Sequence, residues 1–164
     1  MFRARRRLLR VAAQLEVVAR LNKIFHLESD HPLFRYFTED ERDRIEQIAE
    51  VRRIAEGARL IRAGEHDATL FAIEDGHLDI VGTDDGKRVV LATVGPGDVI
   101  GEVSFIDDSP RTVSVIAGED SVVRAWDKRT LSEALAFEPQ LLAKFGVAMS
   151  ELLVERLRDM SRRV

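Results

Sequence analysis

One short segment, residues 101–112, holds the residues whose types and spacing could bind a charged ligand. It reads Gly-Glu-Val-Ser-Phe-Ile-Asp-Asp-Ser-Pro-Arg-Thr and follows a turn-forming run at 94–98. Gly101 lets a backbone approach a ligand without a Cβ in the way, and residues 102–105 can begin a short helix whose free N–H groups face an anion. Arg111 adds a permanent positive charge and a planar fork that suits a phosphate. The segment therefore predicts an anion site built around a phosphate.

Glu102 is the unusual member of this segment, because a carboxylate beside a bound anion is repulsive. Its presence is favourable if it accepts a hydrogen bond from a hydroxyl group of the same ligand, such as a ribose 2′-OH. A ligand that carries one phosphate and one free hydroxyl close together is a cyclic nucleotide. As a residue of a surface loop, Arg111 is expected to contribute little to the stability of the fold.

The segment resembles the phosphate-binding cassette of the cyclic nucleotide-binding domain family. The family pattern is Gly-Glu, a helical turn of small residues, a short loop, Pro-Arg, and then Ser, Thr or Ala before β-branched residues. This chain matches that pattern without a gap, and the likeness extends from about His31 to the C-terminus. The family's spaced turn glycines are present as Gly57, Gly64, Gly76 and Gly97.

The resemblance implies a role for each residue of the cassette. Arg111 pairs with the cyclic phosphate, and Glu102 binds the ribose 2′-OH. The backbone N–H groups of Val103 and Ser104 complete the phosphate cradle together with Gly101. The implied activity is regulation by ligand binding without catalysis, so no catalytic residue and no cofactor is expected beyond the cAMP or cGMP ligand itself.

The resemblance also implies contacts to the purine base. Thr112 can hydrogen-bond a phosphate oxygen or the purine edge, and the last helix folds over the base as a lid, with Arg156 or Leu152 reaching it. A hydroxyl at this position is compatible with both cAMP and cGMP, and the breadth of cAMP use in the family favours cAMP. Ligand binding is expected to draw the last helix inward and to signal to an effector or a second subunit. The expected ligand-binding residues are Gly101, Glu102, Val103, Ser104, Arg111, Thr112 and Arg156.

The elements that must position these residues are mostly strands. Short β-branched segments separated by Gly and Asp turns run from Arg53 to Trp126, which is typical of an all-β sandwich or barrel. Asp84-Asp85-Gly86 predicts a hairpin. We therefore predict an α+β fold, an antiparallel β-roll or jelly roll flanked by N-terminal helices and a C-terminal lid helix. The expected strands lie at 60–61, 70–73, 78–81, 88–91, 113–116 and 122–126.

Helical patterns lie on both sides of the strands. Thr38 is expected to cap a helix that runs to about Val51, with Glu41 in the capping-box position. Asp127 is expected to cap a helix over 128–136, and Glu138-Pro139 begins the long last helix. The domain boundaries are thus an N-terminal helix at 1–30 and a ligand-binding domain at 31–164, with its β-roll at about 53–126 and its C-terminal helices at 128–163.

Residues 1–27 carry an apolar stripe with alternating steps of three and four residues. Such a stripe is a heptad seam with a polar Asn at one a position. The segment is either a helix packed on its own domain or the seam of a homodimer, and both alternatives stay open. The seam residues are Leu8, Val11, Leu15, Val18, Asn22 and Phe25.

Composition excludes several classes of protein. The 164 residues contain no cysteine, which excludes disulfides, thiolate metal sites and cysteine nucleophiles. The formal net charge of −4 argues against direct nucleic-acid binding. No apolar run approaches the roughly 18–20 residues of a membrane span, and no signal peptide is expected, because the arginines near the N-terminus precede an amphipathic pattern. The chain fits a cytoplasmic protein, or a cytoplasmic domain of a larger one, that senses a ligand for an effector outside residues 1–164.

Other chemistries are disfavoured by spacing. The four histidines (His26, His31, His66 and His77) lack the H-x-H arrangement of a jelly-roll metal site, so no metal is expected. Asp107 and Asp108 are expected to form a solvated turn rather than an acid–base pair. Two alternatives stay open: a vestigial β-roll kept for dimerisation without ligand, and, less favoured, a metal-dependent jelly-roll enzyme.

Overall fold

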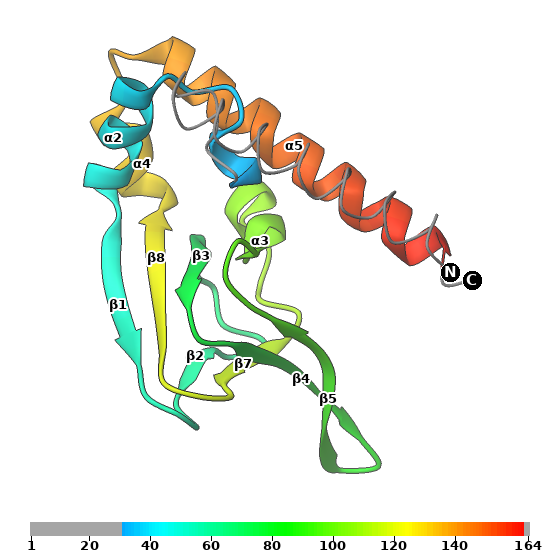
Figure 1. Ribbon diagram of the computed structural model, residues 1–164. Coiled ribbons are helices and arrows are strands. Elements are labelled where there is room, and N and C mark those ends of the chain that lie inside the picture. Colours follow the sequence, from blue (N-terminus) through cyan, green and yellow to red (C-terminus); the bar gives the residue numbers. More distant parts are fainter. Residues whose placement is uncertain (1–30, 163–164) are drawn as a thin grey trace, which may run out of the picture.

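The computed structural model describes residues 31–162, which form two four-stranded antiparallel sheets with helices gathered at one end (Figure 1). The strand orders are β1-β8-β3-β6 and β2-β7-β4-β5. The predicted β-roll with flanking helices is confirmed. The strands are β1 Glu50–Ile54, β2 Arg59–Ile61, β3 Thr69–Asp75, β4 Leu78–Asp84, β5 Lys87–Val94, β6 Val99–Ile100, β7 Ser114–Ala117 and β8 Ser121–Asp127. The helices are η1 Pro32–Phe34, α2 Glu39–Ile48, α3 Glu102–Asp107, α4 Lys128–Ala134 and α5 Pro139–Arg162.

Two strands were not predicted, and two helix ends were wrong. Helix α2 ends at Ile48 rather than near Val51, because the chain enters β1 at Glu50 and pairs along β8. Strand β1 is a largely exposed edge strand rich in charged residues, so its sequence lacks the apolar alternation of a strand. Strand β6 has only two residues and is held by β3. Helix α4 likewise ends at Ala134, two residues before the predicted end.

The hairpin between β4 and β5 forms where it was predicted. Asp84 pairs with Lys87 across a two-residue loop. Both loop residues, Asp85 (φ 46°) and Gly86 (φ 75°), have left-handed backbone conformations. Two positive φ values in a two-residue loop define a type I′ turn, whose twist matches that of the flanking strands.

Two hydrophobic clusters share strand β3, whose successive side chains point to opposite faces. Phe71 and Ile73 belong to the cluster between the two sheets. Leu70 and Ala72 belong to the cluster under the helices, which also contains Leu33, Phe34, Trp126 and Phe145. The helices therefore pack on the outer face of the sheet β1-β8-β3-β6, and the inner face of this sheet packs against the second sheet.

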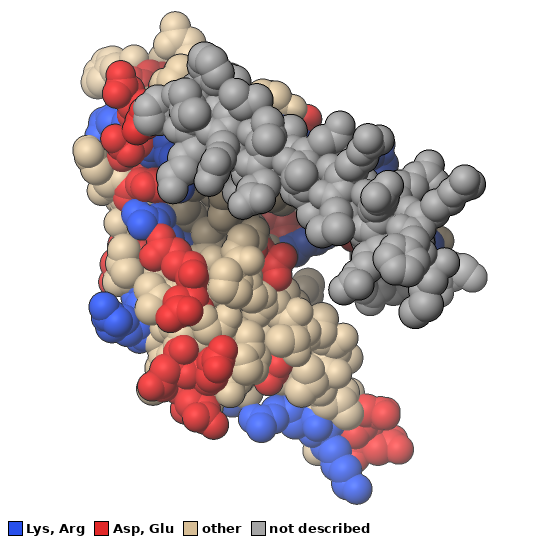
Figure 2. All heavy atoms as spheres, in the orientation of Figure 1, with Lys and Arg blue, Asp and Glu red and all other residues tan. Residues whose placement is uncertain are grey.

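Acidic side chains dominate the charged surface of this part of the chain. Residues 31–164 contain 18 basic and 26 acidic residues, whereas residues 1–30 contain seven basic and three acidic residues. On the face shown in Figure 2, Asp and Glu side chains spread over the sheets, and Lys and Arg are fewer. The two parts of the chain therefore carry opposite net charges.

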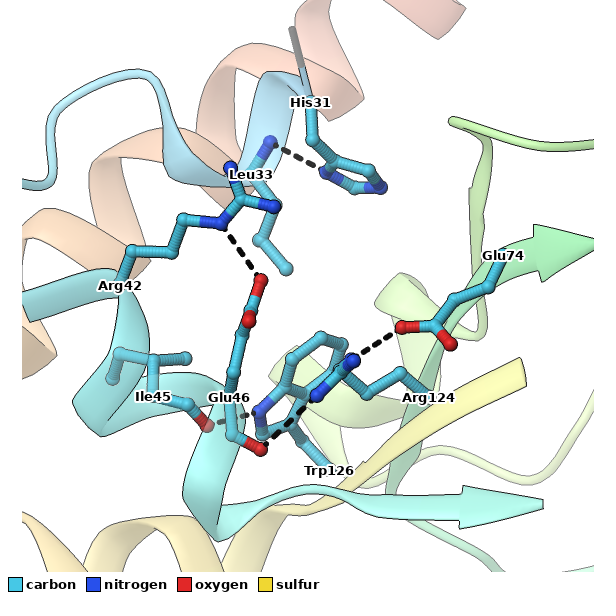
Figure 3. Close-up of polar contacts among 8 residues, drawn as sticks. All are labelled: His31, Leu33, Arg42, Ile45, Glu46, Glu74, Arg124 and Trp126. Carbon is cyan, nitrogen blue, oxygen red and sulfur yellow. Dashed lines mark hydrogen bonds and ion pairs between the residues drawn. The ribbon is translucent and has the colours of Figure 1, made fainter. Parts of the chain in front are cut away.

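Polar contacts fix the helices to strand β8 (Figure 3). The indole Nε1 of the fully buried Trp126 donates to the carbonyl oxygen of Ile45 at 2.9 Å. Arg124 pairs with Glu74 at 2.5 Å. At its N-terminus, α2 has the predicted capping box, in which Thr38 and Glu41 each accept a backbone N–H of the other. Because these contacts link α2, β3 and β8, they form a support at the helical end of the domain.

Helix α5 attaches to this support through its first half. Leu141, Phe145, Ala148 and Met149 are buried in the helical cluster. Lys144 Nζ also contacts the Glu41 carboxylate at 2.7 Å. Beyond these residues α5 continues past α3 and away from the roll (Figure 1). The second half of α5 therefore packs less against the helical cluster than the first half does.

Candidate ligand-binding site

One pocket of about 120 Å³ is lined by all seven residues that the sequence selects as ligand contacts. It lies between the cassette, the inner faces of strands β2, β4, β6 and β7, and the side chain of Arg156 from α5. Its apolar wall is formed by Ile61, Ile80, Ile100, Val113 and Val115. Leu152, the other lid residue considered, packs instead against the helical cluster.

Gly101 allows the cassette to close onto its own arginine. It is the N-cap residue of α3 and has a φ of +87°. A Cβ placed on it would lie 2.6 Å from Arg111 Nη1 and 2.7 Å from the carbonyl oxygen of Thr69. Since any other residue would meet both atoms, the glycine is required for close approach as well as for its backbone conformation.

Arg111 is buried, with 4% of its surface exposed, which corrects the expectation of a surface-loop arginine. The cause is backbone pairing between distant loops: Arg111 N donates to Glu65 O at 2.8 Å, and Gly64 N donates to Arg111 O at 2.7 Å. Its guanidinium donates through Nη2 to Thr69 O at 2.6 Å and through Nη1 to Gly101 O at 3.2 Å. Its Nε has no hydrogen-bond partner among the described residues.

Asp67 completes the surroundings of this arginine and was missed from the sequence. Its Oδ2 accepts from Arg111 Nη2 at 2.7 Å, and its Oδ1 accepts from the Thr69 hydroxyl at 2.6 Å. Burial alone would raise the pKa of Asp67, but hydrogen bonds from Arg111 and Thr69 outweigh it and hold the pKa below the ordinary value. No local pattern marks this residue, because its partner is 44 positions away.

Glu102 and Arg156 form an ion pair across the pocket. Glu102 is 5% exposed, and its carboxylate accepts from Nη1 of Arg156, while Nη2 of the same arginine donates to the carbonyl oxygen of Val99. The arginine thus extends from α5 to Val99, the first residue of β6. In this structure the carboxylate that could bind a ligand hydroxyl is occupied by a residue of the last helix.

The remaining cassette residues line the same pocket. Ser104 is buried, and its carbonyl oxygen accepts from Asp108 N, which ends α3. Val103 and Thr112 are exposed. Helix α3 begins at Glu102, and the first N–H groups of a helix lack intrahelical acceptors. The site therefore combines one buried cation, one buried carboxylate and free backbone donors.

Residues 31–162 contain neither a candidate metal site nor a helix that could span a membrane. No group of three or more His, Cys, Asp or Glu residues there could hold a metal ion. Among the helices of this region, none has both the length and the apolar character needed to cross a membrane. His26 lies outside the described residues, as does the predicted helix at 1–27 with its seam.

Comparison with known proteins decides the family. A family model described as "Cyclic nucleotide-binding domain" matches residues 51–136, more than half of the chain. The chain belongs to the cyclic nucleotide-binding domain family. The matched region contains every residue of the cassette and Asp67, but not Arg156, so the contact from α5 lies outside the part that defines the family here.

Relatives of this cyclic nucleotide-binding domain include kinase regulators. A cGMP-dependent protein kinase of Plasmodium berghei is 32% identical over 136 residues, covering 76% of this chain and 15% of the kinase. A cAMP-dependent protein kinase regulatory subunit of Eremothecium gossypii is 30% identical over 113 residues, covering 67% of this chain and 24% of the subunit. The chain thus spans less than a quarter of the length of these relatives.

Solved structures share the fold. A cyclic nucleotide-binding domain from Methylobacillus flagellatus superposes with a TM-score of 0.72 at 25% identity, covering 78% of this chain and 72% of that one. The Thermus thermophilus catabolite activator protein superposes with a TM-score of 0.71 at 25% identity, covering 80% and 61%. The β-roll and its helices are therefore those of the family.

Proposed function

We propose that this domain binds a cyclic nucleotide in the pocket between Arg111 and Glu102 and regulates an effector without catalysing a reaction. The observation that carries the proposal is the buried guanidinium of Arg111, a residue of the pocket lining whose Nε has no hydrogen-bond partner among the described residues. A buried donor on a cation is costly unless an acceptor arrives. A phosphate oxygen is the acceptor that suits it best.

The two ends of the ligand would meet different groups. The phosphate accepts from Arg111 Nε and from the N–H groups of Val103 and Ser104 at the start of α3. The ribose 2′-OH donates to the Glu102 carboxylate. The apolar wall covers the sugar. Asp67 holds the guanidinium in place through Nη2 at 2.7 Å, which leaves Nε for the ligand.

Arg156 gives this binding site a route to signalling. Arg156 already contacts the buried Glu102 carboxylate, which is the group proposed to accept the ribose hydroxyl. Ligand binding would therefore exchange this ion pair for a hydrogen bond from the ribose. Because Arg156 belongs to α5, the exchange moves the second half of that helix. A ligand can shift such an equilibrium only through contacts that differ between the two states, and this exchange is one.

We favour cAMP as the ligand, and calorimetric titration with cAMP, cGMP and AMP in parallel tests the proposal. AMP has the same base and sugar as cAMP, but its phosphate is esterified to one ribose hydroxyl instead of two. It therefore controls for the cyclic phosphate. Saturable binding of a cyclic nucleotide with weak or absent AMP binding supports the proposal. No binding of either cyclic nucleotide would leave the vestigial β-roll as the better interpretation.

The hydroxyl of Thr112 should influence the choice of purine more than overall affinity. Thr112 follows Arg111 directly and lines the same pocket, where phosphate and base meet. Thr112→Ala should weaken cGMP binding more than cAMP binding, by about 1 kcal/mol, the value of one neutral hydrogen bond. Titration of the variant with both ligands measures the difference. An equal loss for both would show that Thr112 contacts only the shared phosphate.

Ligand binding should change hydrogen exchange in two separate regions. We expect slower exchange at 101–112, where backbone donors gain acceptors, and altered exchange at 145–162, where α5 loses the Arg156 contact. Strands over 70–91 should change little, because they form the rigid scaffold. Exchange measured with and without cAMP checks this pattern. Protection confined to the cassette would mean that the domain does not signal through α5.

A further inference from the structure

Helix α5 has a second apolar face, opposite the one that packs on the domain. Its exposed residues repeat at alternating steps of four and three residues, which places them on one side of a helix. Val147, Val154 and Leu157 are 51%, 42% and 62% exposed. Most of this stripe lines an open groove of about 640 Å³. The stripe, which we call the outer seam, consists of Ala143, Val147, Ser150, Val154 and Leu157.

The chain itself supplies a segment with the matching pattern. Residues 1–27 carry a heptad seam with alternating steps of three and four residues. Two stripes of this period pack together along one line, as in a coiled coil. The lengths agree as well: a helix of 27 residues is about 40 Å long and the 24 residues of α5 are about 36 Å long.

The attachment point lies beside the groove. Residue 31, where the described chain begins, leads directly into η1, whose Leu33 and Phe34 pack in the helical cluster with α5. Arg35, four residues further on, lines the groove and pairs with Glu151 at 3.0 Å. A segment tethered at this point has an effective concentration of the order of millimolar at the groove.

Charge favours the same occupant. The segment 1–30 has seven basic and three acidic residues, whereas the remainder of the chain has 18 basic and 26 acidic residues. Opposite net charges attract and favour intramolecular docking. We propose that residues 1–27 form a helix that packs along the outer seam of α5 in the same chain. The second half of α5, which carries Arg156, is then enclosed between this helix and the pocket.

A pair of substitutions in the full-length chain tests the docking without ligand. Leu15→Glu puts a charge into the N-terminal seam, whereas Ala13→Glu adds the same charge about half a turn away by helical spacing. We expect Leu15→Glu to speed exchange of α5 amides at 150–159 at least tenfold and Ala13→Glu to leave it near the wild-type rate. Val154→Glu should reproduce the first result. Equal exchange in all of these proteins would overturn the proposal.

Cysteine pairs identify the occupant, since the chain has no native cysteine. Leu15→Cys is combined in turn with Val147→Cys, Ser150→Cys and Val154→Cys, and the oxidised proteins are sized under non-reducing conditions. We expect a disulfide within one chain in at least one pair and only monomer for Val154→Cys alone. Covalent dimer from Val154→Cys alone would show that a second copy covers the seam, and absence of any intrachain disulfide also counts against the proposal. Neither readout uses a nucleotide, so failure here is separable from failure of the proposed function.

Discussion

Replacement of Arg111 by alanine is expected to remove most of the affinity for a cyclic nucleotide. The loss should be about 2–5 kcal/mol, the cost of removing one partner of a buried charge contact, or roughly 30-fold to several thousand-fold in Kd. The physical reason is that the buried Arg111, whose Nε is unpartnered among the described residues, is the only cation of the cassette. Calorimetric titration of the variant with cAMP measures the change.

The same variant should also have a lower free energy of unfolding than the wild type, although a surface-loop arginine would contribute little to it. Arg111→Ala leaves the carbonyl oxygens of Thr69 and Gly101 and the Asp67 carboxylate without their shared donor. Buried groups left without partners cost about 1–3 kcal/mol. Chemical unfolding must therefore accompany the titration. Arg129→Ala is the matched control, because the Arg129 side chain is 86% exposed, and it should change neither quantity. Unchanged cAMP affinity in folded Arg111→Ala would refute the binding site.

Gly101→Ala is expected to damage both the fold and the site. An alanine at φ +87° is strained by about 1–2 kcal/mol. Its Cβ would also lie 2.6 Å from Arg111 Nη1 and 2.7 Å from Thr69 O, so the arginine or the backbone must shift. We expect a total loss of about 2–4 kcal/mol of unfolding free energy, because strain adds to the displacement of buried partners. Cyclic nucleotide affinity should fall at least tenfold.

Gly97→Ala separates these two causes. Gly97 has nearly the same backbone conformation, with φ +91°, but a Cβ there would meet no atom within 4 Å. The Gly97→Ala variant should therefore lose only the unfolding free energy that the backbone strain costs, and its ligand affinity should stay normal. Unfolding and titration of both variants in parallel measure the difference. Equal losses of affinity would show that the close approach at Gly101 does not position Arg111.

The sequence by itself determined the features that depend on neighbouring residues. The order of the cassette from Gly101 to Thr112, the type I′ hairpin at Asp85-Gly86 and the capping box of Thr38 are all local. Each rests on backbone conformations and hydrogen bonds between residues a few positions apart, so their residue types carry the information. Together with the pattern of short strands and the family resemblance, these local signals were enough to predict the β-roll and seven of the residues that line its pocket, but not the apolar wall.

Only the tertiary structure decided how those residues are paired. Arg111 is buried against Asp67, 44 positions earlier, and Glu102 meets Arg156, 54 positions later. Strand β1, rich in charged residues, exists because β8 offers it a partner. Such contacts depend on which chain segments the fold brings together. The residues next to a charged side chain in the sequence do not indicate whether it pairs with a distant residue. The state of the site, with its arginine held and its carboxylate occupied, is therefore a property of long-range packing.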